Sequence, residues 1–224
     1  MVKSIVEYLH LEENVAYVTF TGKASLVLRN KGLPATTIHK LIYNCYLDKY
    51  GKLVVYKKEY LPEHIKLIVI DEISMVSKKL LEDLMSFNIP IIALGDHGQL
   101  EPIGEDNGLL KKPDFVLTEI IRQAENNPII RLSKMVREGQ FERMNNSNIK
   151  VLYPKDFDYS MIEWADQTLC GFNSTRNIIN KNVRKCFFHT EEQLPIIGEK
   201  IISLRNKWDT LDSQNNPLIN GTIC

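Results

Sequence analysis

Apolar residues occur along this 224-residue chain in short uninterrupted runs and, between those runs, at every third or fourth position. The uninterrupted runs, at 15–20, 66–70 and 89–95, are typical of strands that are buried on both faces of a parallel sheet. The periodic stretches predict helices at 2–12, 24–30, 36–45 and 77–87. Strands that alternate with helices in this way predict an α/β fold with a parallel sheet.

The segment 46–61 interrupts this alternation and predicts a small β-hairpin, with its turn near Tyr50-Gly51. The second half of the chain predicts a further set of elements: a strand at 115–120, a helix from Asn127-Pro128 to about Gly139, a polar linker at 143–148, a strand at 167–172, a helix at 174–188, and β segments at 198–210 and 216–224. We therefore expect one domain over 1–114 and another over 115–224. Expected helix caps are Ser77, Asn127, Asn173 and Ser174.

Three polar motifs follow directly after the predicted parallel strands. TGKAS (21–25) follows the first strand, Asp71-Glu72 follows the second, and GDHGQ (95–99) follows the third. Ligands of parallel α/β sheets bind beyond the carboxyl ends of the strands. The shared position of the three motifs therefore predicts a single site at this edge of the sheet.

The pair Asp71-Glu72 fits a site for a metal and a nucleotide. An aspartate at the end of a parallel strand can hold Mg²⁺ on nucleotide phosphates, and the adjacent glutamate can polarise an attacking water as general base. Gln99, in the next loop, can donate to a phosphate or orient water. The alternatives are a solvated start to the following helix for the acidic pair and a glycine-rich surface turn for 95–104.

TGKAS contains a Gly-Lys pair followed by a serine, but it does not match the phosphate-binding loop G-x-x-x-x-G-K-[ST]. Tyr17 stands where that loop requires its first glycine, and Ser25 comes one position late. Thr21 and Lys23, at a junction between strand and helix, fit contacts to a nucleic-acid backbone instead. His39 fits either a nucleic-acid contact or a contact within the fold. Arg122 fits either a phosphate contact or a surface ion pair with a nearby glutamate.

Composition narrows the class of protein. Lysine and arginine total 28, as do aspartate and glutamate, so the net charge is zero and a surface coated in positive charge is excluded. A local basic channel remains compatible with this balance. The four cysteines form no CxxC pair and read as reduced thiols, and no apolar run approaches 18 residues. We expect a protein without a membrane span, in the cytoplasm or associated with the nucleoid, with a virus-encoded origin also compatible.

With these motifs in order, the chain resembles the superfamily 1 DNA helicases of the RecD-like group. The resemblance extends over nearly the whole chain, through 18–42 (motif Ia and a Thr-Ile-His segment), LIVIDEISMVS at 67–77 (motif II, the Walker B), 91–104 (motif III), 116–139 (motif IV), and 169–184 with 198–223 (the second motor lobe and a small β-barrel insertion). It implies a RecA-like P-loop NTPase motor lobe over 1–114 and part of a second RecA-like lobe over 115–224.

The same resemblance implies an activity and residue roles. The expected function is ATP-dependent unwinding of DNA in the 5′-to-3′ direction, in DNA replication, repair or recombination, with ATP and Mg²⁺ as cofactors and with single-stranded DNA and duplex junctions as partners. Asp71 would bind Mg²⁺, Glu72 would activate water, Gln99 would sense the γ-phosphate, and Arg122 would stabilise that phosphate. The single strand would contact Thr21, Lys23 and His39. The hairpin at 46–61 fits the group's strand-separating pin or, equally, a surface decoration.

Departures from the family pattern qualify this expectation. Glu101 replaces the first proline of motif III, and the sequence contains neither a Walker A loop nor the late motifs V and VI. We therefore expect an incomplete motor that hydrolyses no ATP by itself and that takes its phosphate loop from a missing N-terminal fragment. The alternative is a non-catalytic helicase remnant that binds DNA or a partner.

Overall fold

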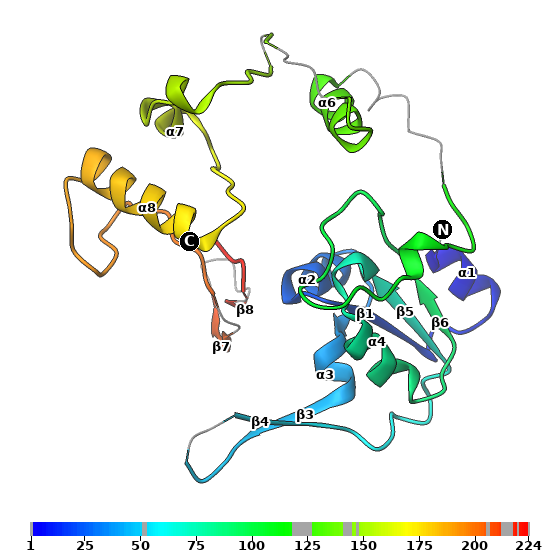
Figure 1. Cartoon of the computed structure of the whole chain (residues 1–224). Coiled ribbons are helices and arrows are strands. Elements are labelled where there is room, and N and C mark those ends of the chain that lie inside the picture. Colours follow the sequence, from blue (N-terminus) through cyan, green and yellow to red (C-terminus); the bar gives the residue numbers. More distant parts are fainter. Residues whose placement is uncertain are drawn as a thin grey trace. The chain divides into compact units, whose positions relative to one another are not determined.

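The computed structural model describes two compact units, Met1–Val116 with Lys200–Cys224 and Leu117–Glu199 (Figure 1). The residues described are 2–50, 53–117, 127–140, 145–146, 148–204, 207–211, 217–218 and 220–223.

Unit 1 is built on a four-stranded parallel sheet with the strand order β2-β1-β5-β6. Its strands are β1 (Val15–Thr19), β2 (Thr36–Thr37), β5 (Leu67–Asp71) and β6 (Ile91–Ala93). The predicted α/β fold with a parallel sheet is therefore confirmed, and the three apolar runs are its three longest strands. Within the described residues β6 has a neighbour on one side only, and its side chains are half-buried at Ile91 and Ile92 and exposed at Ala93.

Helices cover both faces of this sheet. On one face, α1 (Val2–Tyr8) and α2 (Gly22–Asn30) pack through Val6 and Leu28 against Tyr17, Leu67 and Val69. The opposite face is covered by α3 (Ile38–Ile42) and α4 (Lys78–Met85).

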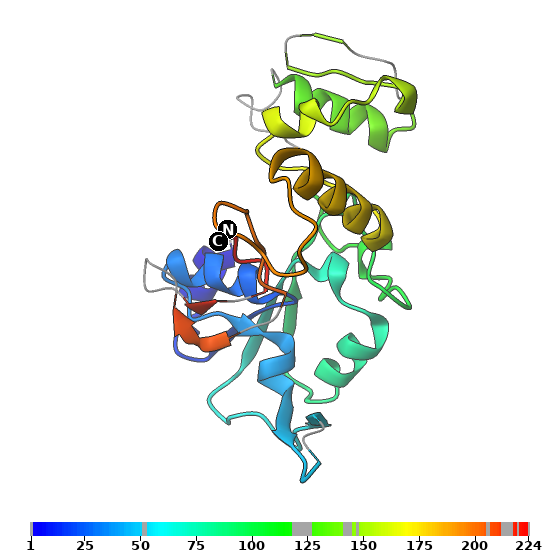
Figure 2. The same ribbon diagram turned by 90° about the vertical axis from the view of Figure 1, so that its left-hand side faces the viewer.

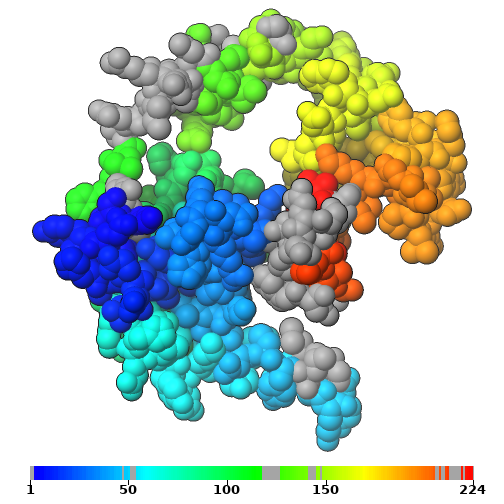
Figure 3. Space-filling model, turned by 180° about the vertical axis from the view of Figure 1, so that it is seen from behind, coloured from blue at the N-terminus to red at the C-terminus, as the bar shows by residue number. Residues whose placement is uncertain are grey.

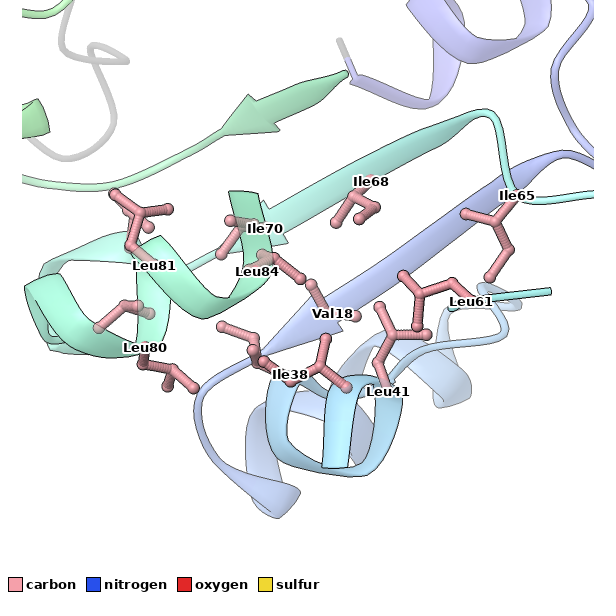
Figure 4. Packing of buried hydrophobic residues seen from close by; sticks show 13 residues of the cluster. Val18, Ile38, Leu41, Leu61, Ile65, Ile68, Ile70, Leu80, Leu81 and Leu84 are labelled. Carbon is pink, nitrogen blue, oxygen red and sulfur yellow. The ribbon is translucent and has the colours of Figure 1, made fainter. Parts of the chain in front are cut away.

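Alternate strand residues point to these two layers, as the pleat of a strand requires. Val18, Ile68 and Ile70 are 0% exposed and pack with Ile38 and Leu84 from the α3 and α4 side (Figure 4). Burial on both faces explains why β1 and β5 read as continuous apolar runs.

The hairpin consists of β3 (Tyr43–Leu47) and β4 (Leu53–Lys57), paired antiparallel. It extends beyond α3 and away from the sheet, as both ribbon views and the light blue segment of Figure 3 show. The hairpin is confirmed, but it begins three residues earlier than predicted. Cys45, the last residue of the helix predicted at 36–45, lies in β3, because α3 ends at Ile42 and Tyr43 is already extended, with φ −115° and ψ 151°.

The remaining described elements lie outside the sheet, its covering helices and the hairpin. They are the 3-10 helices η1 (Ile73–Met75), η2 (Leu109–Lys111) and η3 (Pro154–Asp156), the helices α6 (Pro128–Arg137), α7 (Ser160–Trp164) and α8 (Asn173–Phe187), and the paired strands β7 (Lys207–Leu211) and β8 (Pro217–Leu218). Among the described residues, no helix has both the length and the apolar character needed to cross a membrane.

Several local predictions can be compared with these elements. The helix after Asn127 is confirmed, and Asn127 Oδ1 accepts the Ile129 amide at 2.9 Å as its cap. Ser77 occupies the cap position of α4 without a side-chain cap bond, and the cap residue of α8 is Phe172 rather than Asn173 or Ser174.

Two predicted strands are wrong where the structure describes them. Residues 167–172 contain no strand, and neither do 115–117, while 118–120 lie outside the described residues together with half of the predicted linker. The predicted β segment at 198–210 forms a strand only from Lys207, with an isolated bridge between Ile202 and Ile223.

Candidate functional site

The three motif-bearing loops meet at one edge of the sheet. β1, β5 and β6 run parallel, so their carboxyl ends face the same way. The register pairs Thr19 with Asp71, which places the start of TGKAS level with the acidic pair. The structure therefore confirms the common location of the motifs, which is the position where parallel α/β sheets bind ligands.

The acidic pair adopts an unusual backbone conformation. Asp71 is the last residue of β5, and its Oδ1 accepts the Glu72 amide at 3.1 Å. Glu72 itself is left-handed, with φ 61° and ψ 48°, a conformation that is uncommon for residues other than glycine. Both side chains are partly exposed at the sheet edge. Backbone outliers of this kind cluster at functional sites, where the surrounding structure maintains them.

Hydrogen bonds connect the loop after β5 to the loop after β6. Ser74 is 4% exposed, and its Oγ donates to Oε1 of the exposed Gln99 at 3.3 Å. The Ile73 amide donates to the Leu94 carbonyl at 2.9 Å. Asn107 Nδ2 donates to the carbonyls of Ile73 and Val76, which fixes the η1 turn from the other side. Gln99 is thus tied to the acidic loop through Ser74, from which it is 25 positions distant in sequence.

The glycine-rich loop is shaped by packing at its first glycine. A Cβ at Gly95 would lie 2.6 Å from Ile73 Cγ2 and 3.0 Å from a Leu110 methyl group, so only glycine fits there. Asp96 then closes a tight turn: its Oδ1 accepts the Gly98 amide at 2.8 Å, and its carbonyl accepts the Gln99 amide at 3.1 Å. These contacts hold Gln99 in place. The sequence of the motif alone did not indicate that its loop would be fixed in this way.

At TGKAS, the strand ends at Thr19 and α2 begins at Gly22. Thr21 Oγ1 accepts the Ala24 amide at 3.2 Å and caps the helix, and a buried hydroxyl pair joins Thr19 Oγ1 to Ser25 Oγ at 2.6 Å. Residues 17–19 belong to β1, and only Phe20 and Thr21 separate them from α2, so this stretch does not form the loop of backbone amides that a phosphate-binding loop requires. Lys23 is exposed on the first turn of α2.

His39 lies on α3 with one side against aromatic rings. Its ring centroid is 5.9 Å from that of Phe20 and 5.8 Å from that of Tyr43. This partial burial lowers the pKa of His39 below its usual value near 6.5. The lowered pKa favours the neutral ring, which can stack on a base or form a hydrogen bond.

The structure thus brings together most of the predicted site residues. Asp71, Glu72 and Gln99 lie in two adjoining loops, and Thr21 and Lys23 follow the neighbouring strand, while Arg122 lies outside the described residues. Sequence reasoning missed Ser74 and Asn107, because their roles depend on which loops become neighbours. The one available signal was the serine three positions after Asp71, within the motif itself.

The donor set at the acidic loop fits a nucleotide-bound Mg²⁺ and does not fit an all-protein metal cage. No group of three or more histidine, cysteine, aspartate or glutamate side chains gathers among the described residues. Mg²⁺ on a nucleotide keeps several waters and takes one or two carboxylates plus the phosphates. Asp71, partly exposed at the strand end, can supply that carboxylate.

A model of the AAA domain family matches residues 1–152 of the chain. The chain belongs to this family. It is 31% identical over 147 residues to the ATP-dependent RecD2 DNA helicase of Deinococcus radiodurans, a match that covers 62% of the chain and 19% of that relative. It is also 26% identical over 237 residues to the uncharacterized protein R530 of Acanthamoeba polyphaga mimivirus, covering 82% of the chain and 48% of that protein.

Among solved structures, the chain is similar to a Pif1 helicase at forked double-stranded DNA, with a TM-score of 0.47 and 19% identity over 98% of the chain and 63% of that structure. A Bacteroides Pif1 in complex with ADP-AlF4 gives a TM-score of 0.44 and 20% identity. The similarity to the RecD2 helicase confirms the resemblance to RecD-like superfamily 1 helicases, and the parallel α/β sheet of unit 1 agrees with the RecA-like motor lobe that this resemblance implies. The chain spans less than half the length of both curated relatives.

Proposed function

We propose that this chain is part of an ATP-dependent DNA helicase that translocates on single-stranded DNA in the 5′-to-3′ direction. The observation that supports this most is the hydrogen bond from Ser74 Oγ to Gln99 Oε1. It links a loop with two carboxylates to a loop with a neutral phosphate-sensing side chain, at the edge where parallel sheets bind ligands. An ordinary surface turn would not need a buried serine for this link.

In this proposal the acidic residues have separate tasks. Asp71, at the strand end, holds the Mg²⁺ that neutralises the nucleotide phosphates. Glu72, turned by its left-handed backbone away from the strand direction, acts as general base toward the attacking water. Gln99 senses the γ-phosphate through its amide group. By resemblance, Arg122 stabilises the charge of that phosphate.

The DNA contacts use the neighbouring strand end. Lys23 is exposed on the first turn of α2 and supplies a positive charge for a phosphate. Thr21 has a hydroxyl that already caps the helix, so we infer that its contact with DNA involves the backbone nearby. His39, edge-on to Phe20, contributes a ring to the same strand. The exposed hairpin acts at the duplex junction.

The phosphate loop is supplied from outside residues 1–224, either by an upstream fragment or by another chain. No Gly-x-x-x-x-Gly-Lys-Ser/Thr sequence occurs in the 224 residues, and Asp71 and Glu72 cannot replace its phosphate contacts. We therefore expect negligible DNA-stimulated ATP hydrolysis by these residues alone. Turnover near 1 per second, the lower range of typical enzymes, would refute the need for an external loop.

The test of function is made in a chain completed by its phosphate loop. Asp71→Asn should weaken Mg-nucleotide binding as well as turnover. Glu72→Gln should leave nucleotide binding nearly unchanged and reduce turnover by roughly 10²–10⁴-fold, the usual contribution of a positioned general base. Equal loss of binding in both variants would contradict the separation of roles. A completed chain that binds DNA without any turnover would favour the non-catalytic remnant.

A further inference from the structure

One face of the hairpin presents two neighbouring tyrosines. The antiparallel register pairs Asn44 with Tyr56 and Tyr46 with Val54. Directly paired residues point to the same side of a two-stranded sheet, so Tyr46 and Tyr56 are diagonal neighbours on one face. Their ring centroids are 5.9 Å apart at an interplanar angle of 65°, and they are 52% and 49% exposed. We refer to Tyr46 and Tyr56 as the tyrosine platform.

The geometry of the tyrosine platform leaves ring surface available. In an edge-to-face pair only one ring uses its face, so aromatic surface remains for another flat group. Tyr50, at the turn of the same hairpin, is 81% exposed, and Lys49 Nζ lies 5.0 Å from its ring centroid. Large rings are thus gathered on an arm that extends away from the core of unit 1 (Figure 3).

The root of the hairpin is held to α4 by both of its strands. Tyr43 Oη donates to Asp83 Oδ2 at 2.5 Å, and Lys57 Nζ donates to Ser86 Oγ at 2.8 Å and lies 4.0 Å from Asp83 Oδ1. Tyr43 and Lys57 are directly paired in the register, so the Asp83 carboxylate contacts one side chain from each strand of the hairpin. An isolated two-stranded hairpin is marginally stable, and this attachment orients the tyrosine platform before a ligand binds.

The charge of the hairpin favours a polyanion as the ligand. Residues 43–60 contain four lysines and two acidic residues, a net charge of +2 in a chain whose total is zero: Lys49, Lys52, Lys57 and Lys58 against Asp48 and Glu59. A ligand with both flat rings and negative charges satisfies both features of this surface. Unpaired nucleotides are such a ligand, because every base has a π-face and every linkage has a phosphate.

We propose that Tyr46 and Tyr56 form a stacking surface for unpaired bases of single-stranded DNA, separate from the contacts at Lys23 and His39. This inference rests on the proposed function, because it assumes that the chain binds single-stranded DNA. It goes beyond a pin that parts a duplex by steric exclusion, since it assigns attractive base contacts to one face of the hairpin.

The experiment compares two labelled oligonucleotides of equal length by fluorescence anisotropy, one of thymidines and one of abasic sugar-phosphate units. The abasic strand keeps the phosphates and removes the rings. The double variant Tyr46→Ala/Tyr56→Ala should bind the thymidine strand about 5- to 150-fold more weakly than the unaltered chain, which is the affinity that one stacked base contributes. It should bind the abasic strand with nearly the same affinity as the unaltered chain. Tyr46→Phe/Tyr56→Phe should retain binding of both strands.

Two controls separate the inference from its premise. Tyr8→Ala removes a tyrosine that is 82% exposed on α1, and it should leave both affinities unchanged. Lys23→Ala should weaken both oligonucleotides equally, because it removes a phosphate contact.

Equal affinity of the unaltered chain for both strands, together with a loss on Lys23→Ala, would overturn the stacking surface and leave the proposed function intact. Absence of binding to either strand would overturn both. Stacking would also be refuted if the Tyr46→Ala/Tyr56→Ala variant bound the abasic strand and the thymidine strand with equal losses of affinity.

Discussion

Replacing Glu72 with glycine should give a more stable chain than replacing it with alanine. This order is the reverse of the usual one, because glycine normally destabilises a folded protein relative to alanine through the greater freedom of its unfolded chain, by about 0.4–1 kcal/mol. At φ 61° an alanine Cβ meets the following carbonyl, at a cost of roughly 1–2 kcal/mol that glycine avoids. Taken together, the two effects make the glycine variant more stable to unfolding than the alanine variant by about 1 kcal/mol.

The assay is thermal unfolding of the 224-residue chain followed by far-UV circular dichroism. For a chain of this size, about 1 kcal/mol corresponds to a shift of about 2–4 °C in Tm. Glycine and alanine both remove the carboxylate, so the comparison isolates the backbone. A Tm for the glycine variant at or below that of the alanine variant would show that Glu72 is not held in a left-handed conformation.

Glu72→Gln provides the matching test of charge, because it keeps the side-chain shape and the backbone strain. Without a metal nucleotide, removal of one of two adjacent carboxylates should leave Tm unchanged or raise it slightly. A clearly lower Tm would indicate a structural partner for the Glu72 carboxylate, and the general-base role would lose its main support.

Three further outcomes follow from the packing and from the strand-end contacts. Tyr43→Phe should destabilise the chain at pH 8 by roughly 1–2 kcal/mol through the lost bond to Asp83. Burial and Asp83 raise the pKa of Tyr43 to about 12. The unfolding free energy of the parent should therefore exceed that of Tyr43→Phe by the full amount below pH 10, and this excess should shrink towards pH 12 as the phenol ionises. An excess that does not change with pH would contradict this role of Tyr43. Gly95→Ala should lower Tm because its Cβ would lie 2.6 Å from Ile73 Cγ2, and a variant as stable as the parent would refute this close packing. Binding of single-stranded DNA should have a shallow salt dependence, measured by anisotropy, that becomes shallower still in Lys23→Ala.

The sequence predicted the sheet and the location of the site because both depend on local patterns. The first four residues of β5, 67–70, are apolar and buried at every position, as burial on both faces requires, and the end of that run fixes Asp71 at the sheet edge. The family resemblance added roles for individual residues, and these remain predictions, including that of Arg122.

The features that the sequence did not predict depend on neighbours distant along the chain. Cys45 has the spacing of a helix face, yet it forms a strand because residues 53–57 pair with it. Local propensity is overridden by a partner strand in such cases. The left-handed backbone of Glu72 and the bond between Ser74 and Gln99 depend on how the loops after β5 and β6 pack together.

The open side of β6 has a practical consequence for handling the protein. Its backbone N–H and C=O groups on that side have no strand partner among the described residues, and Ile91 and Ile92 of the same strand are half-buried. The opposite border of the sheet, β2, is only two threonines long and gives little template for such addition. Unpaired apolar edges recruit strands from other molecules. We therefore expect light scattering from purified chain to rise with protein concentration, and a lysine at Ala93, which is exposed on that strand, to suppress it.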